Sequence, residues 1–202
     1  MNFYPSSPRF ISDAVAEQLI RAIDHRALIV GVYVNESWDV IEAHQVRFEL
    51  DAIQLHGNEL PIDVPGFLRN VSIIKATTWG TETPADHLTA KDWIECRDKL
   101  LLKGLLVDAY DPIQHGGTGR IVRWDLLNPR PIPLVKTRLI LAGGITPENI
   151  AEAVGIARPD AVDTASGIEV TPGIKSAERM QKFVEEARKV FIDGRQWLAD
   201  TV

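Results

Sequence analysis

Two carboxylates of this sequence stand where chemistry is expected. Asp108 follows the apolar run 105–107, and Asp163 follows the short apolar run 161–162. An unpaired carboxylate is costly to bury, so an acid at the end of an apolar strand is expected to face a site rather than the core. The alternative for each of the two carboxylates is that it lies at a solvent-exposed strand end and belongs to no site.

Two small-residue turns follow neighbouring apolar runs. Gly143 and Gly144 follow the run 139–142, and Ser166 and Gly167 come shortly after Asp163. Glycines allow backbone N–H groups to approach a ligand, and a following helix N-terminus adds partial positive charge. One such turn is also common between a strand and a helix. In parallel βα barrels the common phosphate site lies at the loops after the last two strands. Two such turns after the last two apolar runs therefore predict a phosphate site.

A long glycine-rich loop spans residues 110–119. It ends in Gly116, Gly117, Thr118 and Gly119 and directly follows Asp108. Loops of this kind often close over a site, so we expect it to be a mobile flap.

Gln54 and His56 alternate along one strand and are expected to point to the same face. His56 is either a site residue or a structural histidine. Lys75 lies within an apolar strand, where a charge needs a partner, so we expect an inward ion pair. Cys96 lies on a helix and is not expected to be a nucleophile. No Cys or His cluster has metal-ligand spacing, so no metal site is expected.

Apolar runs alternate with helical patterns along the whole chain of 202 residues. This alternation predicts βα units, a parallel sheet and a single domain over residues 1–202. The expected strands are residues 27–34, 52–56, 71–77, 104–109, 138–142 and 161–164. The expected helices are residues 12–24, 37–48, 84–97, 147–157 and 176–191. A weak helix interrupted by Pro61 and Pro65 is expected over residues 60–70, and a helix broken by prolines over residues 125–134. The segment 1–9 can supply at most the tail of one more strand.

Composition narrows the classes of function. The net charge of −6 argues against a nucleic-acid surface, while a local anion pocket stays possible. No apolar run approaches the roughly 18 residues that suggest a membrane helix, and no signal peptide is visible. With a single cysteine and no such segments, we expect a cytoplasmic protein.

The motif set resembles one family, phosphoribosylanthranilate isomerase of tryptophan biosynthesis. The matching stretches run in family order over nearly the whole chain. They are FYPSSPRFIS, VGVYVNES, AIQLHGNE, IKA, LLVDAYDPIQHGGTG, Trp124, LAGGITPENI and VDTASGIEVTPGIKS.

The resemblance implies a TIM (βα)8 barrel that converts N-(5-phosphoribosyl)anthranilate to 1-(2-carboxyphenylamino)-1-deoxyribulose 5-phosphate by an Amadori rearrangement without a cofactor. By matching positions, Asp108 is the general acid that opens the ribose ring, and Arg9 holds the anthranilate carboxylate. Asp163 steadies the substrate amine, and Gln54 and His56 also bind substrate. The backbone N–H groups of four residues hold the phosphate: Gly143, Gly144, Ser166 and Gly167.

The chain departs from the family pattern at its start. The family opens with a strand reading roughly K-I-C-G, whose Cys is the general base, and no segment here matches it. We therefore expect a barrel truncated at the N-terminus, with six to seven of its eight strands. Open edges of this kind predict low stability or dimerisation through the gap, so the expected state is monomer or homodimer.

Three explanations of this departure stay open. The chain is a fragment or has a misplaced start codon, it is a non-catalytic phosphosugar-binding remnant of the barrel, or it is active with another base. An unrelated enzyme such as a ribulose-phosphate epimerase is disfavoured, because it would need metal ligands and would lack Arg9.

Overall fold

The computed structural model describes residues 1–78, 84–108 and 124–199. The chain divides into two compact units. The first comprises Met1–Thr77 and Thr83–Leu106, and the second comprises Thr78–Glu82 and Val107–Val202. Each expected strand is present, with bounds that differ from the expected ones by up to three residues.

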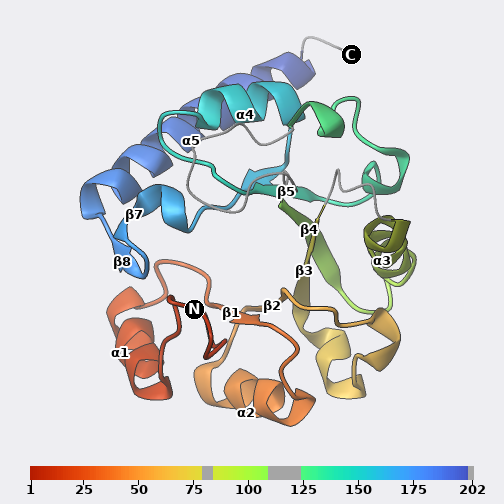
Figure 1. The fold of residues 1–202 in the computed structure, drawn as a ribbon, viewed down its shortest axis with the longest axis vertical. Coiled ribbons are helices and arrows are strands. Elements are labelled where there is room, and N and C mark those ends of the chain that lie inside the picture. Colours follow the sequence, from red (N-terminus) through yellow and green to blue (C-terminus); the bar gives the residue numbers. More distant parts are fainter. Residues whose placement is uncertain (79–83, 109–123, 200–202) are drawn as a thin grey trace. The chain divides into compact units, whose positions relative to one another are not determined.

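The first unit is built on parallel strands that follow the chain order β1 (Val30–Tyr33), β2 (Ala52–Leu55), β3 (Ser72–Thr78) and β4 (Leu102–Asp108) (Figure 1). Val30 pairs with Ala52 and Ala52 with Ser72, so β1, β2 and β3 pair in a continuous register. All four residues of β2 are buried, as expected for a strand covered on both faces.

This unit also contains α1 (Asp13–Ile23), which precedes β1, α2 (Trp38–Phe48), which joins β1 and β2, and α3 (Pro84–Glu95), which joins β3 and β4. Ser37 caps α2, because its Oγ accepts the Val40 N–H at 3.4 Å. Ser12 occupies the N-cap position of α1, but its side chain makes no capping hydrogen bond.

No α-helix forms over residues 60–70, where a weak helix interrupted by prolines was expected. Two short 3-10 helices, Pro61–Asp63 and Gly66–Asn70, take its place. Pro61 and Pro65 lack backbone N–H donors, and proline disfavours helical geometry in the residue before it. The prolines therefore divide this connection.

The first residues of the chain run parallel to β1. Asn2 forms an isolated bridge with Val32. The Phe3 N–H donates to the Val32 carbonyl at 3.0 Å, and the Val32 N–H donates to the Met1 carbonyl at 2.8 Å. The expectation that this segment supplies only the tail of a strand is confirmed.

Aromatic packing fixes this segment to the first unit. The Phe3 ring stacks on those of Tyr33 and Phe48, with 5.5 Å between centroids in each pair. The His44 ring lies 4.5 Å from that of Phe3, and its Nδ1 is 3.2 Å from the Tyr33 hydroxyl. Burial lowers the pKa of His44, and the Asp13 carboxylate partly opposes this shift.

The second unit contains the parallel strands β5 (Leu139–Ala142) and β6 (Ala161–Val162) and the helices α4 (Ile150–Ala157) and α5 (Ala177–Ala199), which pack together (Figure 1). Short 3-10 helices at Trp124–Leu127 and Ile132–Leu134 replace the broken helix expected over residues 125–134. A third is Ser166–Ile168.

Two features of this unit differ from expectation. Helix α4 begins at Ile150 with Asn149 at its N-cap, rather than at Pro147. Asn149 Oδ1 accepts the Thr146 N–H at 2.7 Å, so residues 146–149 form a turn that delays the helix. The antiparallel hairpin of β7 (Glu169–Thr171) and β8 (Ile174–Lys175) was not expected.

Replacing Phe3 tests the aromatic packing. Phe3 is 4% exposed, so Phe3→Ala removes a buried ring and is expected to lower the free energy of unfolding by about 3–5 kcal/mol. Urea unfolding monitored by circular dichroism measures the loss. Tyr4→Ala, at a 36% exposed neighbour, is the control and should change it by about 0.5 kcal/mol or less. Equal losses in the two variants would contradict this account.

Candidate active site

In the first unit, the loops that carry predicted site residues gather at the carboxyl ends of the strands. Because β1 and β2 are parallel, Asn35 and His56 leave them at the same edge. The segment paired with β1 runs in the same direction, so the turn that contains Arg9 begins there too. This edge is where barrel enzymes place their active sites.

Gln54 and His56 lie beside each other, as expected from their alternation. Gln54 is buried, and its Nε2 is 3.1 Å from Nδ1 of the exposed His56. The His56 N–H donates to the Tyr33 carbonyl at 2.8 Å, which fixes its backbone against β1.

The half-buried Arg9 closes a compact turn. Its N–H donates to Ser7 Oγ at 3.1 Å, and Asn2 Nδ2 donates to the same oxygen at 3.3 Å. The Tyr4 N–H donates to Asn2 Oδ1 at 2.9 Å. The asparagine thus ties both sides of the turn to the segment beside β1.

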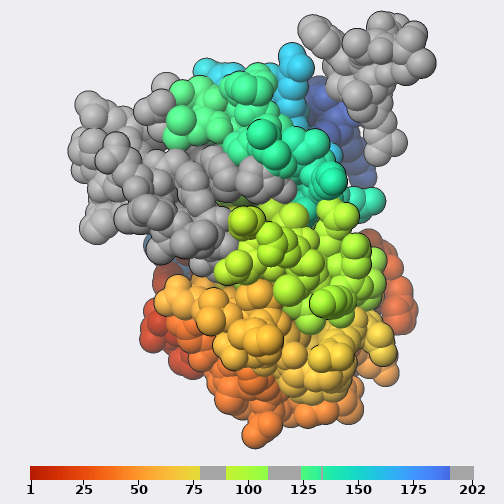
Figure 2. Space-filling model, turned by 90° about the vertical axis from the view of Figure 1, so that its right-hand side faces the viewer, coloured from red at the N-terminus to blue at the C-terminus, as the bar shows by residue number. Residues whose placement is uncertain are grey.

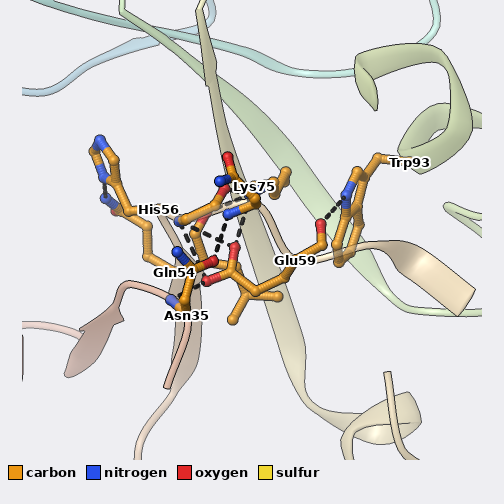
Figure 3. A network of polar contacts seen from close by, with 9 residues as sticks. Asn35, Gln54, His56, Glu59, Lys75 and Trp93 are labelled. Atoms are coloured by element: carbon orange, nitrogen blue, oxygen red, sulfur yellow. Dashed lines mark hydrogen bonds and ion pairs between the residues drawn. The ribbon is translucent and has the colours of Figure 1, made fainter. Parts of the chain in front are cut away.

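A buried ion pair lies beneath these loops (Figure 3). Lys75 Nζ is 2.8 Å from Glu59 Oε2, and the two side chains are 1% and 4% exposed. The expectation of an inward ion pair at Lys75 is confirmed. Burial lowers the pKa of Lys75, and its hydrogen bond with Glu59 opposes this shift.

Glu59 was not identified from the sequence as a site residue. Its carboxylate accepts the N–H of Asn35 at 2.8 Å and of Gly57 at 3.0 Å. Trp93 Nε1 donates to the Glu59 carbonyl at 3.1 Å. The available signal was that a buried Lys75 requires an acid, and Glu59 follows the neighbouring strand by only four residues.

In the second unit, the two predicted phosphate turns lie against each other. Gly143 and Gly144 have φ of 82° and 64°, values that favour glycine. The Thr164 hydroxyl donates to the Ile145 carbonyl at 2.6 Å. A Cβ on Gly167 would lie 2.0 Å from that same carbonyl oxygen. The approach of the two turns therefore depends on the missing side chain of Gly167.

The two candidate carboxylates also belong to this unit, because the division between the units falls within β4, before Val107. Asp108 is the last residue of β4 and is half-buried. Asp163 is exposed, and its N–H donates to the Leu141 carbonyl at 2.8 Å, beside the end of β5. Ser166 is exposed and begins the 3-10 helix Ser166–Ile168. The predicted flap, with Gly116, Gly117, Thr118 and Gly119, lies outside the described residues.

Two hollows are lined by other residues than Asp108, Asp163 and the two glycine-bearing turns. One of about 380 Å³ lies in the second unit, between the start of α5 and Glu148. The other, about 800 Å³, lies in the first unit where the segment after α3 meets residues 60–69, and Figure 2 shows these segments in contact. Cys96, Leu60 and Leu100 are among the residues that line it.

Within residues 1–78, 84–108 and 124–199, no group of acidic, His and Cys side chains is arranged to hold a metal ion. In the same residues, no helix combines the length and apolar character required to cross a membrane.

Comparison with known proteins gives a consistent result. The family model described as N-(5'phosphoribosyl)anthranilate (PRA) isomerase matches residues 1–186. N-(5'-phosphoribosyl)anthranilate isomerase of Citrifermentans bemidjiense is 34% identical over 188 residues, which cover 93% of this chain and 84% of that protein.

Two solved structures extend the comparison. Phosphoribosyl anthranilate isomerase from Thermotoga maritima matches with a TM-score of 0.78 and 32% identity, over 94% of this chain and 86% of that one. A phosphoribosyl anthranilate isomerase in complex with reduced 1-(o-carboxyphenylamino)-1-deoxyribulose 5-phosphate matches with a TM-score of 0.75 and 30% identity, over the same shares of the two chains.

These likenesses confirm the α/β TIM-barrel class that the family resemblance implied. The motifs that suggested a family are spread over the segments that the family model matches. Because that match spans nearly the whole chain, the chain belongs to the phosphoribosylanthranilate isomerase family.

Proposed function

We propose that this chain catalyses the isomerisation of N-(5-phosphoribosyl)anthranilate to 1-(2-carboxyphenylamino)-1-deoxyribulose 5-phosphate in tryptophan biosynthesis. The family match over residues 1–186 carries the proposal. The contact between the two glycine-bearing turns of the second unit supports it, because a phosphosugar needs closely spaced backbone N–H donors. We expect the reaction to need no cofactor. The enzyme is expected to act in the cytoplasm and to be a monomer or a homodimer.

The reaction requires an acid, a base and a place for each charged group of the substrate. Asp108 donates a proton to the ribose ring oxygen as the C1–O bond breaks, and the anthranilate nitrogen forms an iminium. Removal of the C2 proton then gives an enolamine, which becomes the ketone. Asp163 steadies the amine, and the Arg9 guanidinium pairs with the planar carboxylate.

The base for the C2 proton is supplied in the family by the Cys of the K-I-C-G strand, and no position of this sequence matches it. That observation keeps a second candidate, a barrel that binds the phosphosugar without turning it over. An assay that follows the loss of anthranilate fluorescence, beside calorimetric titration with the reduced product analogue, separates the two. Turnover supports the isomerase, and binding alone supports the second candidate. A folded chain that neither turns over the substrate nor binds the analogue overturns both candidates.

Replacing Asp108 tests the general acid. Asp108→Asn keeps the shape of the side chain but removes its proton, so kcat is expected to fall by about 10²–10⁴-fold. The Kd of the reduced analogue, which needs no ring opening, should stay within about threefold, a change of less than 1 kcal/mol. Asp98→Asn, at an 89% exposed side chain, is the control and should leave both values unchanged. An active Asp108→Asn enzyme would rule out the assigned role.

Replacing Gly167 tests the phosphate site. A Cβ at this position would collide with the Ile145 carbonyl, so Gly167→Ala is expected to separate the turns. It should weaken binding of the reduced analogue about tenfold or more and lower the free energy of unfolding by about 1–3 kcal/mol.

The matched control is Gly155→Ala, in the middle of α4 with open space around the added Cβ. It is expected to leave binding unchanged and to stabilise the chain by about 0.5–1 kcal/mol, because alanine favours helix. Unchanged analogue affinity in Gly167→Ala would remove this turn from the phosphate site.

A further inference from the structure

The Glu59–Lys75 pair is directed at the backbone on both sides of His56. Lys75 Nζ donates to the Gly57 carbonyl at 2.6 Å and to the Leu55 carbonyl at 3.4 Å. Glu59 in turn accepts the Gly57 N–H at 3.0 Å. The residues before and after His56 are therefore held by one buried ion pair, and the His56 N–H is bound to Tyr33.

The same pair joins the turn to the neighbouring loop. Glu59 Oε1 accepts the Asn35 N–H at 2.8 Å, and Asn35 Oδ1 accepts the Asn58 N–H at 2.6 Å. A Cβ on Gly57 would lie 2.3 Å from Asn35 Oδ1, so the two loops are in tight contact. Little freedom is left to the backbone of residues 55–59.

Stability alone does not account for such a pair. Two well-packed apolar side chains are often as stabilising as a buried ion pair, because both charges lose their hydration. Here the other hydrogen bonds of the pair go to Asn35, Leu55 and Gly57, at the carboxyl ends of β1 and β2. His56 itself stays exposed and touches Gln54, on the side of the network away from Trp93 (Figure 3).

We propose that Glu59 and Lys75 are positioning residues that hold the His56 side chain, with Gln54, in the orientation that binds the anthranilate-bearing substrate. This inference rests on the proposed function of the site. Neither residue touches the substrate in this account, and both act through the backbone of the His56 turn.

A double-mutant cycle tests the inference. The variant Glu59→Gln/Lys75→Met removes both charges together and leaves none buried and unpaired. Its KM for N-(5-phosphoribosyl)anthranilate is expected to rise about tenfold, equivalent to about 1.4 kcal/mol, while inhibition by inorganic phosphate is unchanged. In a His56→Ala background the same two substitutions should raise KM less than about twofold, because the group they position is gone.

Glu17→Gln is the matched control. It removes a carboxylate of the same unit whose ion pair with Arg47 is exposed, and it should change neither KM nor phosphate inhibition. A purely structural role for the pair predicts an equal change of KM with and without His56, or a fall in kcat with KM unaltered. Either result would overturn the inference.

Amide hydrogen exchange tests the role of the Glu59–Lys75 pair without substrate. Loss of the pair should accelerate exchange at the Asn35 and Gly57 amides while the amides of β2 stay protected. Unaltered exchange at the first two amides would refute the holding role. If the unmodified chain neither turns over substrate nor binds the reduced analogue, the proposed function fails, whereas the exchange result still decides whether the pair holds the turn.

Discussion

The first unit depends on how it accommodates one buried positive charge. Lys75 lies inside a parallel sheet, where an ammonium group without partners would be prohibitively costly. The chain places the Glu59 carboxylate 2.8 Å away and directs two backbone carbonyls at the same nitrogen. The turn after β2 therefore brings both Gly57 and Glu59 to the ammonium of Lys75. The shape of this loop is therefore a consequence of solvating Lys75 from within.

The second unit depends on the close approach of two backbone segments, the turn at residues 143–145 and the turn at Gly167. What allows this approach is an absent side chain rather than a charge. The carbonyl of Ile145 lies where a Cβ of Gly167 would be, and Gly143 and Gly144 adopt left-handed backbone angles. Neutral main-chain groups that are already packed need no rearrangement when an anion arrives, which is what makes turns of this kind suited to a phosphate.

Much of this arrangement could be predicted from the sequence, because apolar runs and their flanking polar residues are local signals. The strands around Val32, Gln54 and Leu141 are found on this basis. In the segment 60–70 the interruption by Pro61 and Pro65 was expected, but not that it leaves only 3-10 turns in place of a weak α-helix. The hairpin of β7 and β8 was missed although Pro172 and Gly173 mark a turn, since Val170 and Ile174 are exposed and show no burial pattern. The role of Glu59 depends on a contact across sixteen residues, which spacing alone does not reveal.

The fluorescence of Trp93 is expected to respond to the charge on Lys75. Its fully buried indole donates to the Glu59 carbonyl, and the Lys75 ammonium lies 5.9 Å from its ring centroid. A cation so near an aromatic face interacts with the electrons that absorb and emit light. The emission wavelength of Trp93 should therefore follow the protonation of Lys75, and it can be read without an added label once the other four tryptophans are replaced by phenylalanine.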